Sequence, residues 1–128
     1  MKLICFLLMM VLITACDKPI ISDTEFRDLS FVQTTTPSNV ALNQSIVSQV
    51  KVSGSDLCYH FAYFTVSQQQ FLVDIHAKGT YPTKPGACPQ AIYYKDTTIS
   101  VPANTVGKYV LRFYNGDVLF KSDTVQVN

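Results

Sequence analysis

The two histidines and two of the four cysteines are the strongest candidates in this chain for acid–base, nucleophilic or metal chemistry. His60 and His76 lie between Cys58 and Cys88 in the sequence. The four are a conceivable zinc ligand set by type, but they lack the short paired spacings of zinc modules. The chain holds no G-x-S-x-G, no H-E-x-x-H and no Gly-rich phosphate loop. We therefore expect no metal, no cofactor and no catalytic residue, so that the protein is not an enzyme.

The histidines have ordinary structural interpretations. His76 alternates with Asp74 and Lys78, which predicts a solvated outer face of a strand. His60 lies in an aromatic stretch and is expected to be partly buried and hydrogen-bonded.

Tyrosines are the remaining candidates for function, because their apolar rings and polar tips suit contact with sugars or protein partners. Six of them exceed what one small core needs: Tyr59, Tyr63, Tyr81, Tyr93, Tyr94 and Tyr114. Packing inside the domain is the alternative use. The absence of Trp weakens a carbohydrate interpretation, because Trp stacks most strongly.

The N-terminal sixteen residues have the pattern of an export signal. Lys2 supplies a positive charge, and an almost unbroken apolar run over residues 3–13 is too short to span a bilayer. Ile13-Thr14-Ala15-Cys16 follows, and this tetrapeptide resembles the lipobox of bacterial lipoproteins. The alternative is an ordinary signal peptide with a chance cysteine.

The lipobox resemblance implies that the chain is cut before Cys16 and that Cys16 carries acyl chains such as palmitate. It places the protein in the cell envelope, held in a membrane by lipid. Asp17 resembles the inner-membrane retention signal of enteric bacteria, but other lineages read that position differently, and we expect the outer membrane or cell surface.

Removal of the signal simplifies the charge and the cysteines. The chain has 10 basic and 9 acidic residues, and loss of Lys2 with the signal makes the two numbers equal. The mature chain then has no net positive charge that would favour binding to nucleic acid. Cys5 is discarded, Cys16 is lipidated, and Cys58 and Cys88 remain as an even pair in an oxidising compartment. We expect a Cys58–Cys88 disulfide.

Apolar alternation and turn residues predict strands and no helix. Ile46, Val50 and Val52 share one face, and Phe71, Val73, Ile75 and Ala77 share another. Tyr109, Leu111 and Phe113 point inward before an Asn115-Gly116 hairpin, expected as a type I′ turn. The aromatic stretch 57–66 is expected to be a central strand, and residues 78–89, with three prolines, a long loop. The predicted strands are 29–36, 46–52, 57–66, 71–77, 91–101, 108–114 and 118–127.

The C-terminal strands carry a second resemblance. Ile99-x-Val101, Gly107-Lys108-Tyr109-Val110-Leu111, the Asn-Gly hairpin and Val125-x-Val127 are similar to the last three strands of bacterial immunoglobulin-like or fibronectin-type-III-like domains. The resemblance implies an all-β fold, a single immunoglobulin-like two-sheet sandwich of about seven strands. The missing Trp and the cysteine spacing argue against an antibody-type domain. The expected division is signal peptide 1–15, lipidated cysteine and tether 16–28, and sandwich 29–128.

The function expected from these features is a non-catalytic, lipid-anchored binding or structural module with an envelope protein or glycan as partner. An immunoglobulin-like protease inhibitor is the alternative, and a small hydrolase has the least support. Residues 78–89 are the expected contact loop, with Tyr81, Lys84, Tyr93 and Tyr94 as binding residues. The loop could instead only stabilise a crossover between the sheets.

Overall fold

The computed structural model describes residues 23–128. This part of the chain forms eight β-strands and contains no helix. The predicted signal peptide, the lipidation at Cys16 and most of the predicted tether lie outside these residues. Within them no helix could span a membrane. The strands are β1 (Thr24–Thr35), β2 (Asn39–Val40), β3 (Ser45–Gly54), β4 (His60–Gln69), β5 (Leu72–Pro82), β6 (Tyr93–Pro102), β7 (Gly107–Asn115) and β8 (Val118–Val127).

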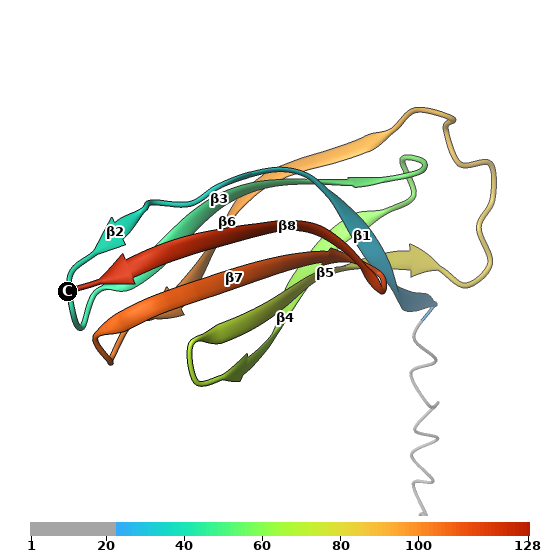
Figure 1. Ribbon diagram of the computed structural model, residues 1–128. Helices are drawn as coiled ribbons and strands as arrows, with labels where there is room; N and C mark the ends of the chain where they lie inside the picture. Colours follow the sequence, from blue (N-terminus) through green and yellow to red (C-terminus); the bar gives the residue numbers. More distant parts are fainter. Residues whose placement is uncertain (1–22) are drawn as a thin grey trace, which may run out of the picture.

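The strands form two packed layers, which confirms the predicted all-β sandwich (Figure 1). One layer contains β2, β8, β7, β5 and β4 in that order. The other contains β3 and its neighbour β6. Strand β1 belongs to both, because residues 24–29 pair with β5 and residues 30–35 pair with β3.

The core lies between the layers and is built from the alternating faces that the sequence predicts. Strands β3, β5 and β7 each bury every second residue, while the residues between them stay partly or fully exposed. Phe113, Leu29, Ile46, Ile75 and Leu111 are the largest side chains that are fully buried. Such one-sided burial fixes the register, since a slip by one residue would expose the whole apolar face.

The crossing of β1 between the layers is held by the side chain of Asn115. The Phe31 N–H donates to Asn115 Oδ1 at 2.6 Å, and Asn115 Nδ2 donates to the Phe31 carbonyl at 3.4 Å. The β1–β3 register is irregular just after Phe31. The amide of Asn115 therefore bonds both backbone groups of a buried residue at the place where its strand changes partners.

Two strand pairs depart from the expected immunoglobulin-like arrangement, in which both sheets are antiparallel. Residues 72–76 of β5 run parallel to β7, and β2 runs parallel to β8. Parallel neighbours need a crossover rather than a hairpin, and β6 provides it by passing through the opposite layer between β5 and β7.

Three predicted elements are placed differently by the structure. The aromatic stretch is not a central strand, because β4 pairs with β5 alone and none of its residues is fully buried. Residues 78–82 belong to β5 rather than to a loop, and Pro82 closes its end opposite Thr24. Strand β1 begins at Thr24, inside the segment 16–28 predicted as a tether, because the edge of β5 is available to pair with it.

The predicted Asn-Gly hairpin is present, but its turn lies one residue later. Asn115 pairs with Val118, so Gly116 and Asp117 form the loop. Gly116 has φ of 59°, whereas neither Asn115 nor Asp117 has a positive φ, so a type I′ turn is excluded. Asn115 is thereby free to bond Phe31.

We expect Asn115→Ala to lower the free energy of unfolding by about 1–3 kcal/mol, because it leaves a buried N–H without an acceptor. Urea unfolding followed by circular dichroism measures this. Asn115→Asp retains the acceptor and should lose less. Asn104→Ala, an exposed amide outside the strands, is the matched control. A change in Asn115→Ala no larger than the control would show that the Phe31 contact does not stabilise the fold.

Candidate functional site

The predicted Cys58–Cys88 disulfide is present and closes one end of the sandwich. The Cα atoms are 5.5 Å apart and the S–S distance is 1.99 Å. The bond ties the segment before β4 to residues 83–92, which connect β5 to β6. The Leu57 N–H also donates to the Pro89 carbonyl at 3.2 Å. The connection is thus attached to the segment before β4 through Cys88 and Pro89.

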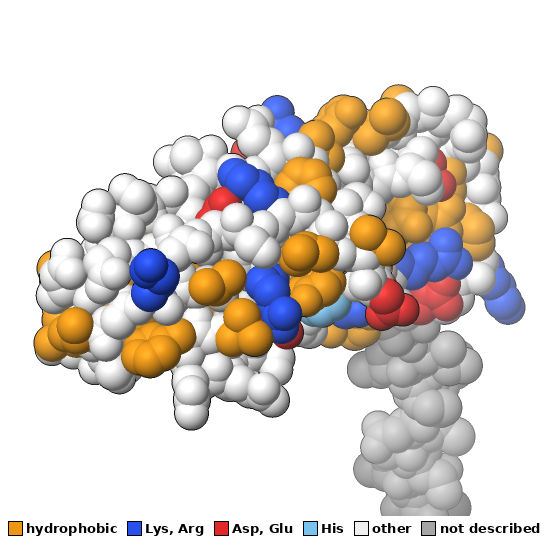
Figure 2. Space-filling view, viewed as in Figure 1, with side chains coloured by type: hydrophobic (Ala, Val, Ile, Leu, Met, Phe, Trp, Pro, Cys, Tyr) orange, Lys and Arg blue, Asp and Glu red, His pale blue; other side chains and the backbone are white. Residues whose placement is uncertain are grey.

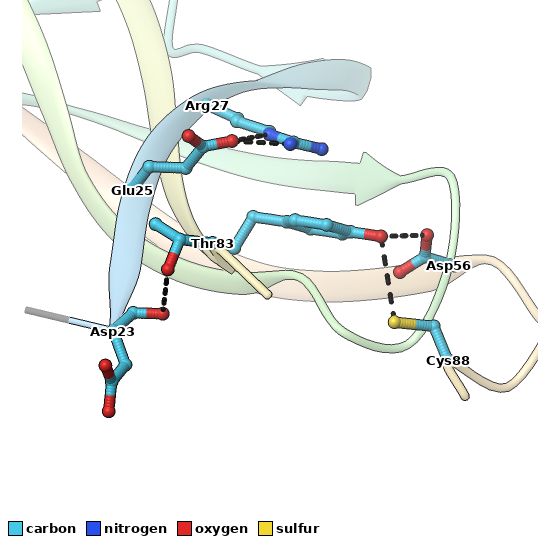
Figure 3. Close-up of polar contacts among 7 residues, drawn as sticks. Asp23, Glu25, Arg27, Asp56, Thr83 and Cys88 are labelled. Carbon is cyan, nitrogen blue, oxygen red and sulfur yellow. Dashed lines mark hydrogen bonds and ion pairs between the residues drawn. The ribbon is translucent and has the colours of Figure 1, made fainter. Parts of the chain in front are cut away.

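Tyr81 is part of this scaffold and not an open contact residue as predicted. It is 8% exposed, and its hydroxyl donates to Asp56 Oδ2 at 2.9 Å and lies 3.7 Å from Cys88 Sγ (Figure 3). The Arg27 guanidinium lies over the Tyr81 ring at 4.0 Å, a cation–π distance. Alternation along β5 explains the burial, since Tyr81 continues the inward face of Val73 and Ala77.

The environment of Tyr81 shifts its ionisation. The hydrogen bond to Asp56 is the main cause that raises the pKa of Tyr81, and burial raises this pKa further. Both effects favour the neutral hydroxyl, because a phenolate could not donate to Asp56 and would lie beside its negative charge. The arrangement stabilises structure and does not prepare Tyr81 to act as a base near neutral pH.

The other predicted binding residues do not meet at one site. Lys84 is exposed in the connection between β5 and β6. Tyr93 is half-buried, and its hydroxyl accepts a hydrogen bond from the Phe61 N–H at 2.9 Å. Tyr94 points outward and is 54% exposed. Lys84 and Tyr94 therefore remain open to a partner, while Tyr93 and Tyr81 bond within the domain.

The potential zinc ligands are separated by the fold. His76 stacks on Tyr114 with ring centroids 5.2 Å apart, and His60 lies edge-on to Tyr93 at 6.0 Å. Among residues 23–128, one group of metal-type ligands comes together, Asp56 with Cys58 and Cys88. Its sulfur atoms are joined in the disulfide, so neither is available as a thiolate ligand.

The disulfide end is also where the described chain begins. The Thr83 N–H donates to the Asp23 carbonyl at 2.9 Å, and β1 leaves from there along the edge of β5. Acidic and basic side chains gather at this end (Figure 2). Arg27 pairs with Glu25 at 2.5 Å, and Lys78 pairs with Asp28.

A cavity at the opposite end of the sandwich was not predicted. It has a volume of about 690 Å³, and its lining includes Gln68, Gln70, Phe71, Asn104 and Tyr109. Gln68 lies near the end of β4, Gln70 and Phe71 form the β4–β5 turn, Asn104 lies in the β6–β7 connection, and Tyr109 lies near the start of β7. They are far apart in the sequence, and no motif or spacing links them.

We expect Tyr81→Phe to lower the melting temperature by a few degrees at neutral pH, because Asp56 loses the hydroxyl that bonds it. The difference from wild type should shrink as the pH rises above 10. The pKa of Tyr81 is higher in the folded protein than in the unfolded chain. The stabilisation by its hydroxyl is therefore fully present below the unfolded-state pKa, and it is lost as the pH rises through the folded-state pKa. Melting curves at stepped pH measure this.

Tyr94→Phe is the matched control, because Tyr94 is exposed and its hydroxyl makes no hydrogen bond within residues 23–128. A Tyr81→Phe protein as stable as this control at every pH would contradict the structural role of the hydroxyl.

Comparison with known proteins gives one family. Residues 49–127, more than half of the chain, match the model of the ORF11 β-sandwich domain. No curated protein and no solved structure matches. The matched segment runs from the middle of β3 to the end of β8 and includes both the disulfide and the cavity. The chain therefore belongs to the ORF11 β-sandwich domain family.

Proposed function

We propose that this protein is a lipid-anchored component of the cell envelope whose sandwich binds another envelope molecule and catalyses no reaction. The lipobox-like Ile13-Thr14-Ala15-Cys16 supports the anchor. The candidate catalytic residues all make structural contacts: both histidines pack on tyrosine rings, and Cys58 and Cys88 form a disulfide. These contacts support a binding role over a catalytic one.

One observation carries the proposal: the place where the chain joins the sandwich. Asp23 bonds to Thr83 at the disulfide end. The stretch from Cys16 to Asp23 spans at most about 25 Å when fully extended. An acylated Cys16 would therefore hold the disulfide end close to the membrane and leave the other end facing outward.

This orientation changes the expected contact surface. The connection 83–92, which contains most of the expected contact loop 78–89, would lie on the membrane side with Lys84. A protease inhibitor needs a loop that enters a deep cleft, and this connection is both tethered by the disulfide and close to the anchor. We therefore favour the outward end over this loop as the partner surface.

We also infer that the sandwich is a variant of the immunoglobulin-like architecture. Strands β6, β7 and β8 support this, because they carry the expected buried pattern and hairpin. The parallel neighbours of β5 and β2 distinguish the variant from antibody-type domains.

The anchor is tested by Cys16→Ala in a bacterial host that processes lipoproteins. We expect the wild-type protein in the membrane fraction, with the mass of a chain that starts at an acylated Cys16. The variant should keep its signal or leave the membrane fraction, because the thiol that accepts the lipid is gone. Mass spectrometry of the purified protein reports both properties.

Cys5→Ala is the matched control, since Cys5 lies in the apolar part of the signal and should not affect processing. If Cys16→Ala fractionates as the wild type and retains its mass, the protein is not lipid-anchored at this residue and the orientation argument fails.

A further inference from the structure

The end of the sandwich that the proposed anchor would turn outward contains a cavity of about 690 Å³. Its lining comes from the turn between β4 and β5, the connection between β6 and β7 and the strand ends beside them. Both connections lie at the end of the sandwich away from the start of β1 (Figure 1). Strand β5 separates the two ends by about 33 Å. The cavity falls within the usual range for small-molecule sites, about 300–1,000 Å³.

An aromatic pair forms its apolar wall. The rings of Phe71 and Tyr109 meet edge-to-face with centroids 5.2 Å apart at 85°. Gly107 has φ of 153°, and a Cβ there would lie 2.7 Å from the Phe71 ring. The Val110 N–H donates to the Phe71 carbonyl at 2.8 Å. The hydrogen bond from Val110 therefore fixes the Phe71 backbone, and Gly107 leaves the space that the Phe71 ring occupies.

Amides and a hydroxyl form the polar part of the lining. Gln68 Nε2 donates to the Gln70 carbonyl at 3.0 Å, and Gln70 itself has a positive φ of 56°. Asn104 and Thr105 make no side-chain hydrogen bond within residues 23–128, so their donors and acceptors face solvent at the cavity. Each amide offers two donors and an acceptor with two lone pairs.

Among residues 23–128, no charged side chain lines this cavity. A site for a phosphate or carboxylate would present Arg or Lys, and a site for an apolar peptide would present few amides. A fixed aromatic ring beside uncharged donors and acceptors matches a sugar ring, which has apolar C–H faces and hydroxyls at its edge. We propose that this cavity binds neutral sugar residues of an oligosaccharide.

The proposal deepens the proposed function, because a glycan of the envelope is what an anchored domain would meet at its outward end. Sugar binding does not require the lipid, however. A failure of sugar binding and a failure of membrane anchoring are therefore separate results.

The test is calorimetric titration of the full mature chain, purified in a detergent without a sugar headgroup, with maltohexaose, cellohexaose and chitohexaose in turn. We expect at least one of them to bind. Phe71→Leu, which keeps apolar volume but removes the ring, should weaken that binding about tenfold. The double variant Asn104→Ala/Thr105→Ala should weaken it several-fold and, because both residues are exposed, should keep the wild-type melting temperature.

Gln49→Ala/Thr98→Ala is the matched control. It removes an amide and a hydroxyl from paired, exposed positions on the outer face of β3 and β6. It should bind sugar as the wild type does. An acidic oligosaccharide, oligogalacturonate, should bind at least about tenfold more weakly than the neutral ligand.

Three results would overturn the proposal. The first is no binding of any neutral hexasaccharide by a folded wild-type chain. The second is binding that Phe71→Leu and the Asn104/Thr105 variant leave unchanged. The third is a preference for oligogalacturonate over every neutral sugar.

Discussion

The passage of β1 from one layer to the other is the constraint on which the rest of the sandwich depends. A strand that changes partners must leave some backbone groups without a ladder, and buried groups of this kind are costly. Here the change occurs beside Phe31, and the Asn115 amide replaces the missing ladder partner. The Phe31 ring packs edge-on against Phe113 at 5.2 Å, so the same residue joins the crossing to the core.

The side of the sandwich between β1 and β8 is closed by a second polar cluster. Thr36 Oγ1 donates to Asp123 Oδ2 at 2.7 Å and lies 2.8 Å from Ser48 Oγ. Lys121 pairs with Asp123 at 3.1 Å and also donates to the Thr34 carbonyl. Ser48 is fully buried at a position where β3 would otherwise place an apolar side chain. Hydrogen bonds across the layers satisfy these groups, and within residues 23–128 no buried side-chain atom lacks a partner.

Alternation predicted the parts of the fold that one-sided burial controls. The inward faces of β3, β5 and β7 follow from period-two patterns, and the disulfide follows from the even pair of cysteines outside the predicted signal peptide and lipidation site. The prediction of a central strand from the composition of the aromatic stretch 57–66 was wrong. Phe61 and Phe64 do pack against the core, but Tyr63 pairs with Phe26 on the outer face, so apolar density did not indicate a central strand.

The prediction of a loop at residues 78–82, which rested on glycine and proline, was wrong for a different reason. Gly79 is required inside the strand, since a Cβ there would lie 2.9 Å from the His60 carbonyl oxygen and 3.0 Å from the Leu29 side chain. Sequence alone cannot distinguish a glycine that ends a strand from one that permits close packing. The cavity beside Phe71 was hidden for a related reason, because its walls come from turns that meet only in the folded chain.

The two ends of β5 differ in how far their polar groups are already used. At the Asp23 end, Arg27 bonds Glu25, Lys78 bonds Asp28 and Tyr81 bonds Asp56, so a partner would have to displace existing contacts. At the opposite end, Asn104 and Thr105 keep their hydrogen-bonding capacity beside a ring that is already fixed. Binding costs least where the contact groups need not break bonds within the protein and the apolar surface is already fixed, because little conformational freedom is lost and only hydrogen bonds to water are exchanged. By this physical criterion, we place the proposed binding surface at the end of the sandwich farthest from the disulfide.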